Sequence, residues 1–583
     1  MHSQKVNAMK SIPFRAVAAR AGRLVAGAVA LVATVVLAAC GGGGTTPITG
    51  VDLRPLSAEF TSRKAVAYSP YRTATSVDGL GAEVITEAQI KQDLDLLVAA
   101  GFGLIRVFDS DDKVGKQTLQ VIEKFGLNMR MQLGIYVQSG QDSYNQGQLA
   151  RGVTLANTYA DIVLAVSIGN ETMVTWSFNK IDPQVMGGYI AKVRGQIAQP
   201  VTTDDNWAFW ASAPTSITDV IDFAALHTYP ELDSVFDVGL WDWQQVDKPE
   251  AQRATAMMDA AIAEARRQYG AARAGLDSKG LSAIPIVIGE TGWNAVDVGR
   301  LRFRAHPVNQ KMYLDRLNAW AAEGRAGAGP KAIFYFEAFD EPWKQGDDKW
   351  GLFNVQRQAR FAIQSLGTCG TTWVCEPGAY TDADALRFVP PVVNTAIAAN
   401  KYTLYSEAVA ATTEFRAVGL SRDAFDGTTA AAPEVGSAAA PGDGSQSIEI
   451  TPQPKDYGWG LLFHSRAAVT ENLSAFAAGG NLVFSIKTNY PGKIEIGLSS
   501  DTADRAGAEA YLQIAPGDYG YCNTDAWCQV TIPLRDFVAK NPKLDLSLVL
   551  ARLVIADRYA FTDKPNNANL TNKLSVDAIY WSR

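Results

Sequence analysis

Apolar residues in the middle of the chain occur in short unbroken runs, and amphipathic stretches separate these runs. Ile284–Ile288 is typical, because it is mostly β-branched and is followed at once by a glycine. Runs of this kind suit parallel strands that are buried on both faces. The predicted strands are Ala65–Tyr68, Leu104–Phe108, Asn128–Leu133, Ile162–Ile168, Val201–Thr203, Phe223–His227, Ile284–Ile288 and Ala332–Phe336.

The stretches between these strands have helical periodicity or are irregular. Ile85–Gly101 places Leu94 and Leu97 at helical spacing and ends at a glycine suited to a helix C-terminus. Asn309–Gly324 is a second predicted helix. Eight strands with such crossovers, over roughly 300 residues, predict an α/β fold of the (β/α)8 TIM-barrel type.

The pattern changes after Ser365. Residues 366–402 hold prolines and two cysteines and are expected to pack on the barrel as a connecting segment, and Gly427–Ser445 is expected to be a linker-like loop. Beyond it, apolar and polar residues alternate with a period of two, which predicts an all-β, jelly-roll-like sandwich. The predicted strands of this part are 447–452, 481–489, 493–500, 510–515, 528–537, 550–558 and 573–581.

The N-terminus has the character of a targeting segment. A positively charged leader precedes the apolar run Leu24–Leu37, which is too short to span a membrane comfortably, so a signal peptide is favoured. The sequence LAAC at residues 37–40 resembles a bacterial lipobox, which implies cleavage before Cys40 and lipid attachment to it. An ordinary secretory signal with an incidental cysteine is the alternative. Gly41 stands where aspartate favours inner-membrane retention in known lipoproteins, so an outer-membrane or cell-surface location is expected.

These patterns together predict five segments. They are a lipoprotein signal peptide (1–39), a flexible tether (40–58), a (β/α)8 barrel (59–368), a connecting segment (369–402) and a β-sandwich (403–583).

The cysteines agree with export. Apart from Cys40, the chain has Cys369, Cys375, Cys522 and Cys528, which form two close pairs. An even number of cysteines in an exported chain predicts disulfides, here 369–375 and 522–528. The spacing does not match a zinc knuckle and the chain has only 4 histidines, so no metal site is expected from these residues.

Composition narrows the function classes. The formal net charge is −7, and no basic patch gathers outside the leader, which argues against a nucleic-acid partner. No cofactor is expected, and the chain is expected to be a monomer that meets a membrane only through its lipid anchor.

Several tryptophans of the middle third are interpreted as sugar-stacking surfaces, although some could be core residues. They are Trp207, Trp210, Trp241, Trp243, Trp293, Trp343 and Trp350.

Two glutamates follow predicted strands. Glu171 comes after the fourth strand and Glu290 after the seventh. They are far apart along the chain, but the strand ends of a barrel converge on one face. Two facing carboxyl groups are what glycoside hydrolysis requires, because one protonates the leaving oxygen and the other attacks the anomeric carbon or activates a water. For Glu290, a solvated loop glutamate beside a packing tryptophan is the alternative.

Several short motifs carry a resemblance to a known family. The chain from about Ala65 to Phe361 resembles glycoside hydrolase family 17, the (β/α)8 β-1,3-glucanases and related glucan transglycosylases. The matching stretches, in order, are AYSPYR (67–72), IRVFDSD (105–111), SIGNE (167–171), HTYP (227–230), GETGW (289–293), FYFEAFDEPWK (334–344) and WGLF (350–353).

The resemblance implies roles for individual residues. Glu171 is the general acid/base, Glu290 is the nucleophile, and Asn170 contacts the sugar 2-hydroxyl. Independently of the resemblance, a nucleophile must stay ionised and therefore needs hydrogen-bond donors, for which Arg106 and Tyr229 at the ends of the second and sixth strands are the candidates. The further predicted substrate-binding residues are Tyr68, Arg106, Trp207, His227, Tyr229, Trp293, Glu337 and Lys344. Glu337, Glu341 and Lys344 either brace the site or bind substrate. Plant members usually differ at His227, so their substrate preference is not carried over.

The leading hypothesis is a retaining hydrolase that cleaves β-1,3-glucan through a covalent glucosyl-enzyme. A transglycosylase that uses the same two glutamates is the first alternative, and a non-catalytic glycan-binding lipoprotein is the second. The sandwich resembles carbohydrate-binding modules, in several of which an aspartate at the place of Asp577 holds a structural calcium ion. Trp459 and Trp527 form either a stacking platform or part of the sandwich core.

Overall fold

The computed structural model describes residues 52–236, 240–297, 301, 303–327, 329–344, 349–408, 414–418, 420–425, 434–436, 438–452, 459–465, 469–500, 508–557 and 573–583. The predicted signal peptide, Cys40 and most of the predicted tether lie outside these ranges. Two compact units divide the chain, and they meet in sequence between Val389 and Pro390. None of the described helices is both long enough and apolar enough to cross a membrane.

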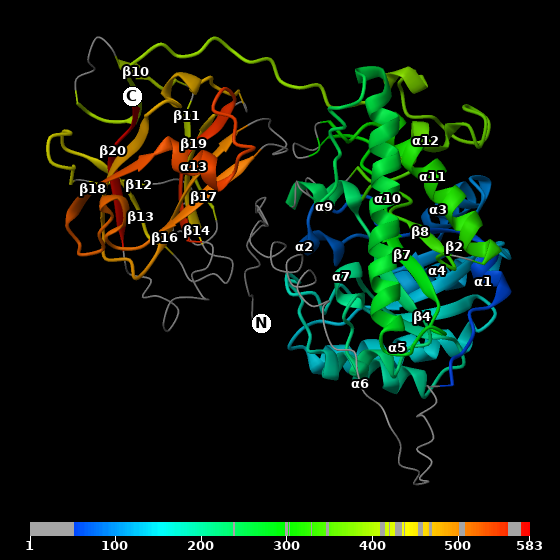
Figure 1. Cartoon of the computed structure of the whole chain (residues 1–583). Coiled ribbons are helices and arrows are strands. Elements are labelled where there is room, and N and C mark those ends of the chain that lie inside the picture. The colour runs from blue at the N-terminus through cyan, green and yellow to red at the C-terminus, as the bar shows by residue number, and fades with distance from the viewer. Residues whose placement is uncertain are drawn as a thin grey trace, which may run out of the picture. The chain divides into compact units, whose positions relative to one another are not determined.

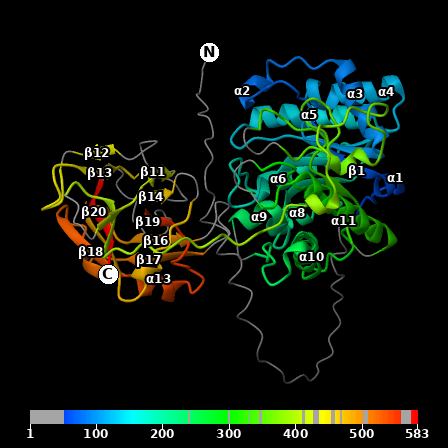
Figure 2. The ribbon, with the colours of Figure 1, turned by 90° about the horizontal axis from the view of Figure 1, so that it is seen from above.

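The first unit is a closed barrel of eight parallel strands, as predicted, and each strand pairs with the next along the chain. Helices surround the closed sheet (Figure 1 and Figure 2). The strands are β1 (Lys64–Ala67), β2 (Phe102–Val107), β3 (Arg130–Ile135), β4 (Val163–Asn170), β5 (Val201–Asn206), β6 (Ala224–His227), β7 (Ile286–Thr291) and β8 (Ile333–Tyr335). Both β4 and β7 continue two or three residues beyond their predicted ends.

The helices of this unit begin and end at residues suited to those places. The predicted helix 85–101 is α3, which starts after a capping box of Thr86 and Gln89. The predicted helix 309–324 lies within α11. The full set is α1 (Ala58–Ser62), α2 (Val77–Leu80), α3 (Glu87–Ala99), the π-helical η2 (Asp112–Lys116), α4 (Gln117–Phe125), α5 (Asp142–Thr158), α6 (Pro183–Arg194), α7 (Trp207–Trp210), α8 (Thr215–Thr218), α9 (Pro230–Phe236), α10 (Glu250–Asp277), α11 (Pro307–Ala326), α12 (Phe361–Gln364) and the 3₁₀ turn η3 (Asp382–Asp384).

A short helix that the sequence pattern did not reveal closes one end of the barrel. Phe60 of α1 is fully buried, and its ring centroid lies 6.1 Å from those of Phe223 and Phe334. These two residues stand at the beginning of strands β6 and β8. The aromatic cluster therefore fills the N-terminal end of the barrel and leaves the C-terminal end for the site.

The second unit is the predicted all-β part, built from two sheets. One sheet has the order β11–β14–β19–β16–β17. In the other, β20 pairs with β15 along one edge and with β13 and β9 along the other. The strands are β9 (Lys401–Tyr405), β10 (Glu414–Arg416), β11 (Leu420–Phe425), β12 (Glu434–Gly436), β13 (Ser447–Ile450), β14 (Trp459–Ser465), β15 (Asn481–Thr488), β16 (Ile494–Ser500), β17 (Glu509–Ile514), β18 (Trp527–Pro533), β19 (Val549–Asp557) and β20 (Leu574–Ser582).

Two predicted boundaries in this unit were wrong. Within the predicted linker-like loop 427–445, residues 434–436 form strand β12, which pairs with β13 inside the sandwich. The end of the predicted strand 528–537 is helical and forms α13 (Leu534–Lys540). One strand, β14 (Trp459–Ser465), was not among the predicted strands, and it lies between β11 and β19 in its sheet. The 3₁₀ turns η4 (Ser474–Phe476) and η5 (Asp518–Gly520) complete the unit.

Candidate active site

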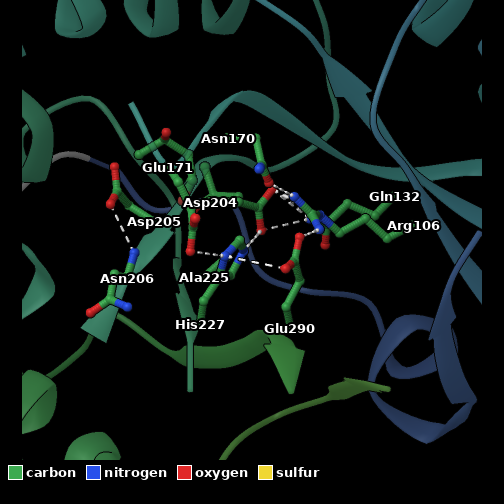
Figure 3. Close-up of polar contacts among 12 residues, drawn as sticks. Arg106, Gln132, Asn170, Glu171, Asp204, Asp205, Asn206, Ala225, His227 and Glu290 are labelled. Carbon is green, nitrogen blue, oxygen red and sulfur yellow. Dashed lines mark hydrogen bonds and ion pairs between the residues drawn. The ribbon is translucent and has the colours of Figure 1, made fainter. Parts of the chain in front are cut away.

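Glu171 stands at the first position after β4. Its amide donates to the carbonyl of Asp204 at 2.9 Å, so the strand pairing with β5 fixes its backbone. Glu171 has φ 48°, a left-handed conformation that few residues other than glycine adopt, and Gly169, two residues earlier, has φ 81°. This turn places the Glu171 side chain among the strand ends of the barrel (Figure 3), where it is 38% exposed.

Glu290 lies inside β7, and its side chain is only 7% exposed. The flanking glycines make this position possible. A Cβ at Gly289 would lie 2.5 Å from Asp204 Oδ1 and 3.3 Å from the His227 ring, and a Cβ at Gly292 would lie 2.0 Å from the Phe336 carbonyl oxygen. The motif GETGW therefore contains glycine where neighbouring strands approach too closely for any side chain.

Arg106 of β2 holds the nucleophile candidate. Its guanidinium donates to Glu290 Oε1 and to the Asn170 side-chain oxygen, both at 2.6 Å, and its Nε lies 3.1 Å from Asp204 Oδ2. Arg106 is 1% exposed, so its charge acts with little screening by water. Because the amide oxygen of Asn170 accepts from Arg106, the amide nitrogen of Asn170 is turned to act as a donor.

The environment of Glu290 favours its ionised form. Burial alone would raise the pKa of Glu290, but the positive charges of His227 and Arg106 and the hydrogen bond from Tyr229 hold this pKa below its usual value. The Tyr229 hydroxyl donates to Glu290 Oε2 at 2.6 Å. Burial and the charge of Glu290 raise the pKa of Tyr229 well above its usual value, so the tyrosine remains a proton donor.

His227 at the end of β6 lies between the two glutamates (Figure 3). Its Nδ1 is 3.0 Å from Glu171 Oε1 and 3.5 Å from Glu290 Oε2. These two carboxylate oxygens can therefore be no farther apart than the sum of the two distances, 6.5 Å. Burial would lower the pKa of His227, but the charge of Glu290 and the hydrogen bond to Glu171 raise it above its usual value.

Two aspartates at the end of β5 complete the cluster, and the sequence argument missed both. Asp204 pairs with Arg106, and Asp205 accepts the backbone N–H groups of Met173 and Asn206, both at 2.8 Å. Asp205 thus fixes the segment that follows Glu171. Burial and the charge of Glu171 raise the pKa of Asp205 to about 7. The acidic pair after the predicted strand Val201–Thr203 was the signal that could have identified them.

Glu337, Glu341 and Lys344 form a separate ion-paired group after β8. Lys344 Nζ lies 3.0 Å from Glu337 Oε2 and also pairs with Glu341, and both glutamate side chains are 2% exposed. Lys344 also lies 4.5 Å from the centroid of the Phe336 ring, and that ring packs on Tyr229. These contacts fit a brace behind Tyr229.

Two of the predicted substrate-binding residues are fully buried aromatic residues, and their contacts disfavour a direct contact with a sugar. Tyr68 is 0% exposed, and its hydroxyl donates to Asp93 on α3 at 3.2 Å. Trp293 is also 0% exposed; its indole N–H donates to the Arg304 carbonyl at 2.9 Å and its ring packs on Tyr313. Both are core residues beside the site. Local sequence could not reveal this, because the covering residues come from distant segments.

Among the other tryptophans of the middle third, Trp207 and Trp210 differ most clearly in burial. Trp210 is fully buried, and its indole N–H donates to the Ala225 carbonyl at 2.8 Å. Trp207, at the start of α7, is only half-buried. Trp241, Trp243 and Trp350 are buried core residues.

The structure confirms both predicted disulfides, one in the barrel unit and one in the sandwich. Disulfides join Cys369 to Cys375 and Cys522 to Cys528. Trp459 is not a stacking surface, because it is fully buried and donates to the Tyr490 hydroxyl at 3.0 Å. Trp527, beside the second disulfide, is half-buried.

Asp577 lies in β20, and backbone donors hold its carboxylate. Its carboxylate accepts the backbone N–H groups of Ala440 and Ala578, both at 2.7 Å. Within the described residues, no group of three or more His, Cys, Asp or Glu side chains is placed to hold a metal ion. Burial and the neighbouring Asp443 raise the pKa of Asp577 to about 6. A structural calcium ion here stays a prediction that these contacts do not favour.

Two family models match the two units. Residues 65–355 match the BtgE/BtgC glycoside hydrolase domain, and residues 402–573 match carbohydrate binding domain 30. The first model covers the eight strands and the glutamate cluster, except for Lys64 at the start of β1. The second covers most of the sandwich.

The chain is also similar to named proteins and to a solved structure. A glucan 1,3-beta-glucosidase of Arthroderma benhamiae is 24% identical over 290 residues, which is 47% of this chain and 84% of the relative. A probable glucan endo-1,3-beta-glucosidase, btgC, of Aspergillus clavatus is 23% identical over 289 residues, which is 46% of this chain but only 38% of that relative. The structure of an endo-laminarinase from Formosa Hel1_33_131 matches with a TM-score of 0.49 and 22% identity, over 57% of this chain and 97% of that chain.

Proposed function

We propose that this chain, whose barrel belongs to the BtgE/BtgC glycoside hydrolases and whose sandwich is a family 30 carbohydrate-binding domain, cleaves β-1,3-glucan with retention of configuration. The predicted glycoside hydrolase barrel with an appended carbohydrate-binding module is confirmed at the level of the two families. The choice of β-1,3-glucan is supported by the names of the similar glucosidases. The non-catalytic alternative is disfavoured, because both glutamates are present at converging strand ends.

The observation that carries the proposed mechanism is the position of His227 between the two glutamates. It limits the separation of the nearest described carboxylate oxygens to 6.5 Å. Retaining enzymes place their carboxyl groups about 5–5.5 Å apart, whereas inverting enzymes need about 6.5–9.5 Å to admit a water. The largest separation that His227 allows, 6.5 Å, therefore equals only the shortest carboxyl separation of inverting enzymes. This favours direct attack on the anomeric carbon by a carboxylate.

The residues fit a two-step reaction. In the first step Glu290 Oε attacks the anomeric carbon, the bond from this carbon to the glycosidic oxygen breaks, and Glu171 gives its proton to that oxygen. In the second step Glu171 takes a proton from a water, the water oxygen bonds to the anomeric carbon, and Glu290 leaves as a carboxylate. Arg106 and Tyr229 keep Glu290 ionised before attack and receive its charge again at the end.

His227 serves as a positioning residue in this scheme. Its Nδ1 reaches both carboxylates, so protonated His227 offers a positive charge to each of them. The charge reduces the repulsion between Glu171 and Glu290 when both are ionised. Such a pair of neighbouring carboxylates would otherwise oppose the ionisation of one member.

Product analysis tests the activity. The full chain is incubated with laminarin, mixed-linkage glucan and short β-1,3-oligosaccharides, and the products are followed by chromatography and by NMR of the newly formed anomeric centre. We expect β-linked oligosaccharides from laminarin and initial products of β configuration. Initial α products would reject the retaining mechanism, and no cleavage of any β-1,3-linked substrate would reject the substrate assignment.

The same assay tests the role of the sandwich, which we propose captures glucan for the barrel. A variant that ends at Val389, the boundary of the barrel unit, should lose activity on laminarin while it keeps activity on short oligosaccharides, because the glutamates lie in the barrel. Equal loss on both substrates would instead make the sandwich a structural support.

We further propose that the chain is an exported lipoprotein at the outer membrane or cell surface, attached only through lipid on Cys40 and monomeric. The two disulfides support export, because such bonds persist in oxidising compartments. Cys40→Ser should release the protein from the membrane fraction or leave its signal peptide uncleaved. A Cys40→Ser protein that fractionates with membranes in processed form would contradict the anchor.

A further inference from the structure

The backbone that carries Glu171 has an unusual conformation. The pairing of β4 with β5 shifts register between Ser167 and Asn170, as at a β-bulge, and Gly169 inside this interval has φ 81°. Bulges are common beside active sites, because they redirect the side chains that follow. Glu171 then adopts φ 48°, and a left-handed residue with a side chain persists only where its surroundings enforce that conformation.

Two hydrogen bonds tie this turn to the end of β5. The Glu171 N–H donates to the Asp204 carbonyl at 2.9 Å, and the Met173 N–H donates to Oδ2 of the Asp205 side chain at 2.8 Å. The first bond joins two backbone groups, whereas the second depends on which residue stands at position 205. Met173 is only 6% exposed, so its N–H would be buried without a partner if that carboxylate were removed.

The carboxylate of Asp205 is itself fixed. It is fully buried, and its Oδ1 accepts the N–H of the next residue, Asn206, at 2.8 Å. One oxygen is thus held by the end of β5, and the other is directed at the turn after β4. An asparagine at this position would offer one acceptor oxygen, and an alanine would offer none.

The two neighbouring aspartates of β5 serve different glutamates. Successive residues of a strand face opposite sides of a sheet. Figure 3 accordingly shows Asp204 toward Arg106, while Asp205 lies beside Asn206. Asp204 shares the Arg106 cation with Glu290, and Asp205 holds the turn that carries Glu171. A change at position 205 can therefore disturb one glutamate and spare the other.

We propose that Asp205 is a positioning residue for proton transfer, which holds the left-handed turn so that the Glu171 carboxyl faces the glycosidic oxygen. This inference rests on the proposed function, because it takes Glu171 as the acid of the first step. Without the Asp205 carboxylate the turn relaxes and the acid moves away from the glycosidic oxygen. The nucleophile keeps its partners Arg106 and Tyr229 and remains able to attack.

The effect should depend on how much the leaving group needs a proton. Phenolate is basic and needs one as its bond to the anomeric carbon breaks, whereas 2,4-dinitrophenolate leaves without one. The test therefore measures kcat/KM for phenyl β-laminaribioside and for 2,4-dinitrophenyl β-laminaribioside, and divides the first by the second. Because both substrates meet the same protein sample, this quotient does not depend on the folded fraction.

We expect Asp205→Ala to lower the quotient about 10- to 100-fold, because a misplaced acid no longer assists the phenyl substrate. Asp205→Asn should lower it less, because its one acceptor oxygen can still serve the Met173 N–H. In a Glu171→Ala background, Asp205→Ala should lower the quotient no further, because no acid is left to be positioned. A merely structural role of Asp205 would change the yield of active protein and leave the quotient as it is.

Asp222 provides a matched control. It is also a fully buried aspartate whose two oxygens accept backbone N–H groups, those of Arg54 and Val201, both at 2.9 Å. Val201 begins β5, so Asp222 lies at the opposite end of the barrel, and Asp222→Ala should reduce stability but keep the wild-type quotient.

Three outcomes would overturn the inference: a wild-type quotient in both Asp205→Ala and Asp205→Asn, an equal loss in Asp222→Ala, or a further loss from Asp205→Ala when Glu171 is already absent. Failure of the proposed function is distinguishable from these, because the wild-type chain would then release no dinitrophenol from its laminaribioside.

Discussion

Glu290→Gln should abolish turnover of laminarin, with a loss of about 10⁴-fold or more in kcat, because no covalent intermediate can form without the nucleophile. Glu171→Ala should fail differently. Its first step needs no acid when the leaving group is good, so p-nitrophenyl β-laminaribioside should still glycosylate Glu290, and the intermediate should then accumulate. Mass spectrometry of the protein mixed with this donor measures the difference between the two variants.

Azide sharpens this comparison, because it attacks the anomeric carbon without needing a general base. It should restore turnover in Glu171→Ala and give a β-glycosyl azide, while Glu290→Gln should not respond. Asp93→Asn, which changes a buried carboxylate that bonds Tyr68 away from the catalytic pair, serves as the control and should show neither accumulation nor rescue. Near wild-type laminarin turnover in either glutamate variant would remove that residue from its role.

Arg106→Leu should destabilise the barrel by about 3–5 kcal/mol, because it leaves Glu290 and Asp204 buried without their shared cation. The same change should move the acidic limb of kcat/KM to higher pH. Arg106 is one of the groups that lower the pKa of Glu290, so without it the nucleophile takes up its proton at a higher pH. Urea unfolding and a pH–rate profile measure the two effects.

The sign of the stability effect follows from the same pKa. Glu290 has a folded-state pKa below its ordinary value of 4.5, so its ionisation contributes stability above that value, and this contribution is lost as the pH falls through the lowered pKa. The difference in unfolding free energy between wild type and Arg106→Leu should therefore shrink in acid. A difference that grows as the pH falls would contradict the ion-pair account.

Two further variants separate charge from packing. Arg106→Lys keeps the charge but not the planar fork, so it should recover part of the stability and much of the pH profile. Arg552→Leu removes an equally buried arginine that pairs with Glu471 in the sandwich. It should destabilise the sandwich and leave the pH profile of the barrel unchanged. A shifted profile in Arg552→Leu would mean that the shift in Arg106→Leu reports lost stability alone.

The strand pattern and the glutamates were predictable because both are local signals. An unbroken apolar run marks a buried strand, and a carboxylate placed just after it is conspicuous. Arg106 was predicted as a donor because the nucleophile must stay ionised, yet its simultaneous contacts with Glu290, Asn170 and Asp204 join β2 to three other strands. Contacts between residues so far apart in sequence leave no periodic trace. Asp204 and Asp205 were missed for this reason, although their adjacency after an apolar strand was visible.

Burial was the weaker part of the sequence argument. Tyr68 and Trp293 were predicted to bind substrate, and Trp459 was left open between a stacking platform and the sandwich core. In the structure each finds a hydrogen-bond partner from another segment, namely Asp93, the Arg304 carbonyl and the Tyr490 hydroxyl. An aromatic residue with a polar edge can therefore be buried completely wherever the fold supplies one acceptor. Whether such an acceptor lies beside the ring depends on tertiary contacts and not on neighbours in sequence.

The N-terminal part of the chain reaches the barrel at the end that the aromatic cluster around Phe60 fills. Arg54, just before this cluster, donates its backbone N–H to Asp222 Oδ1 at 2.9 Å and its guanidinium to the Arg194 carbonyl at 2.8 Å. These partners lie at the entrance of the strands, opposite the glutamates. Only 11 residues separate Cys40 from Asp52, the first described residue, a reach of at most about 40 Å when fully extended. A chain attached through Cys40 would therefore enter the barrel at the end opposite the glutamates.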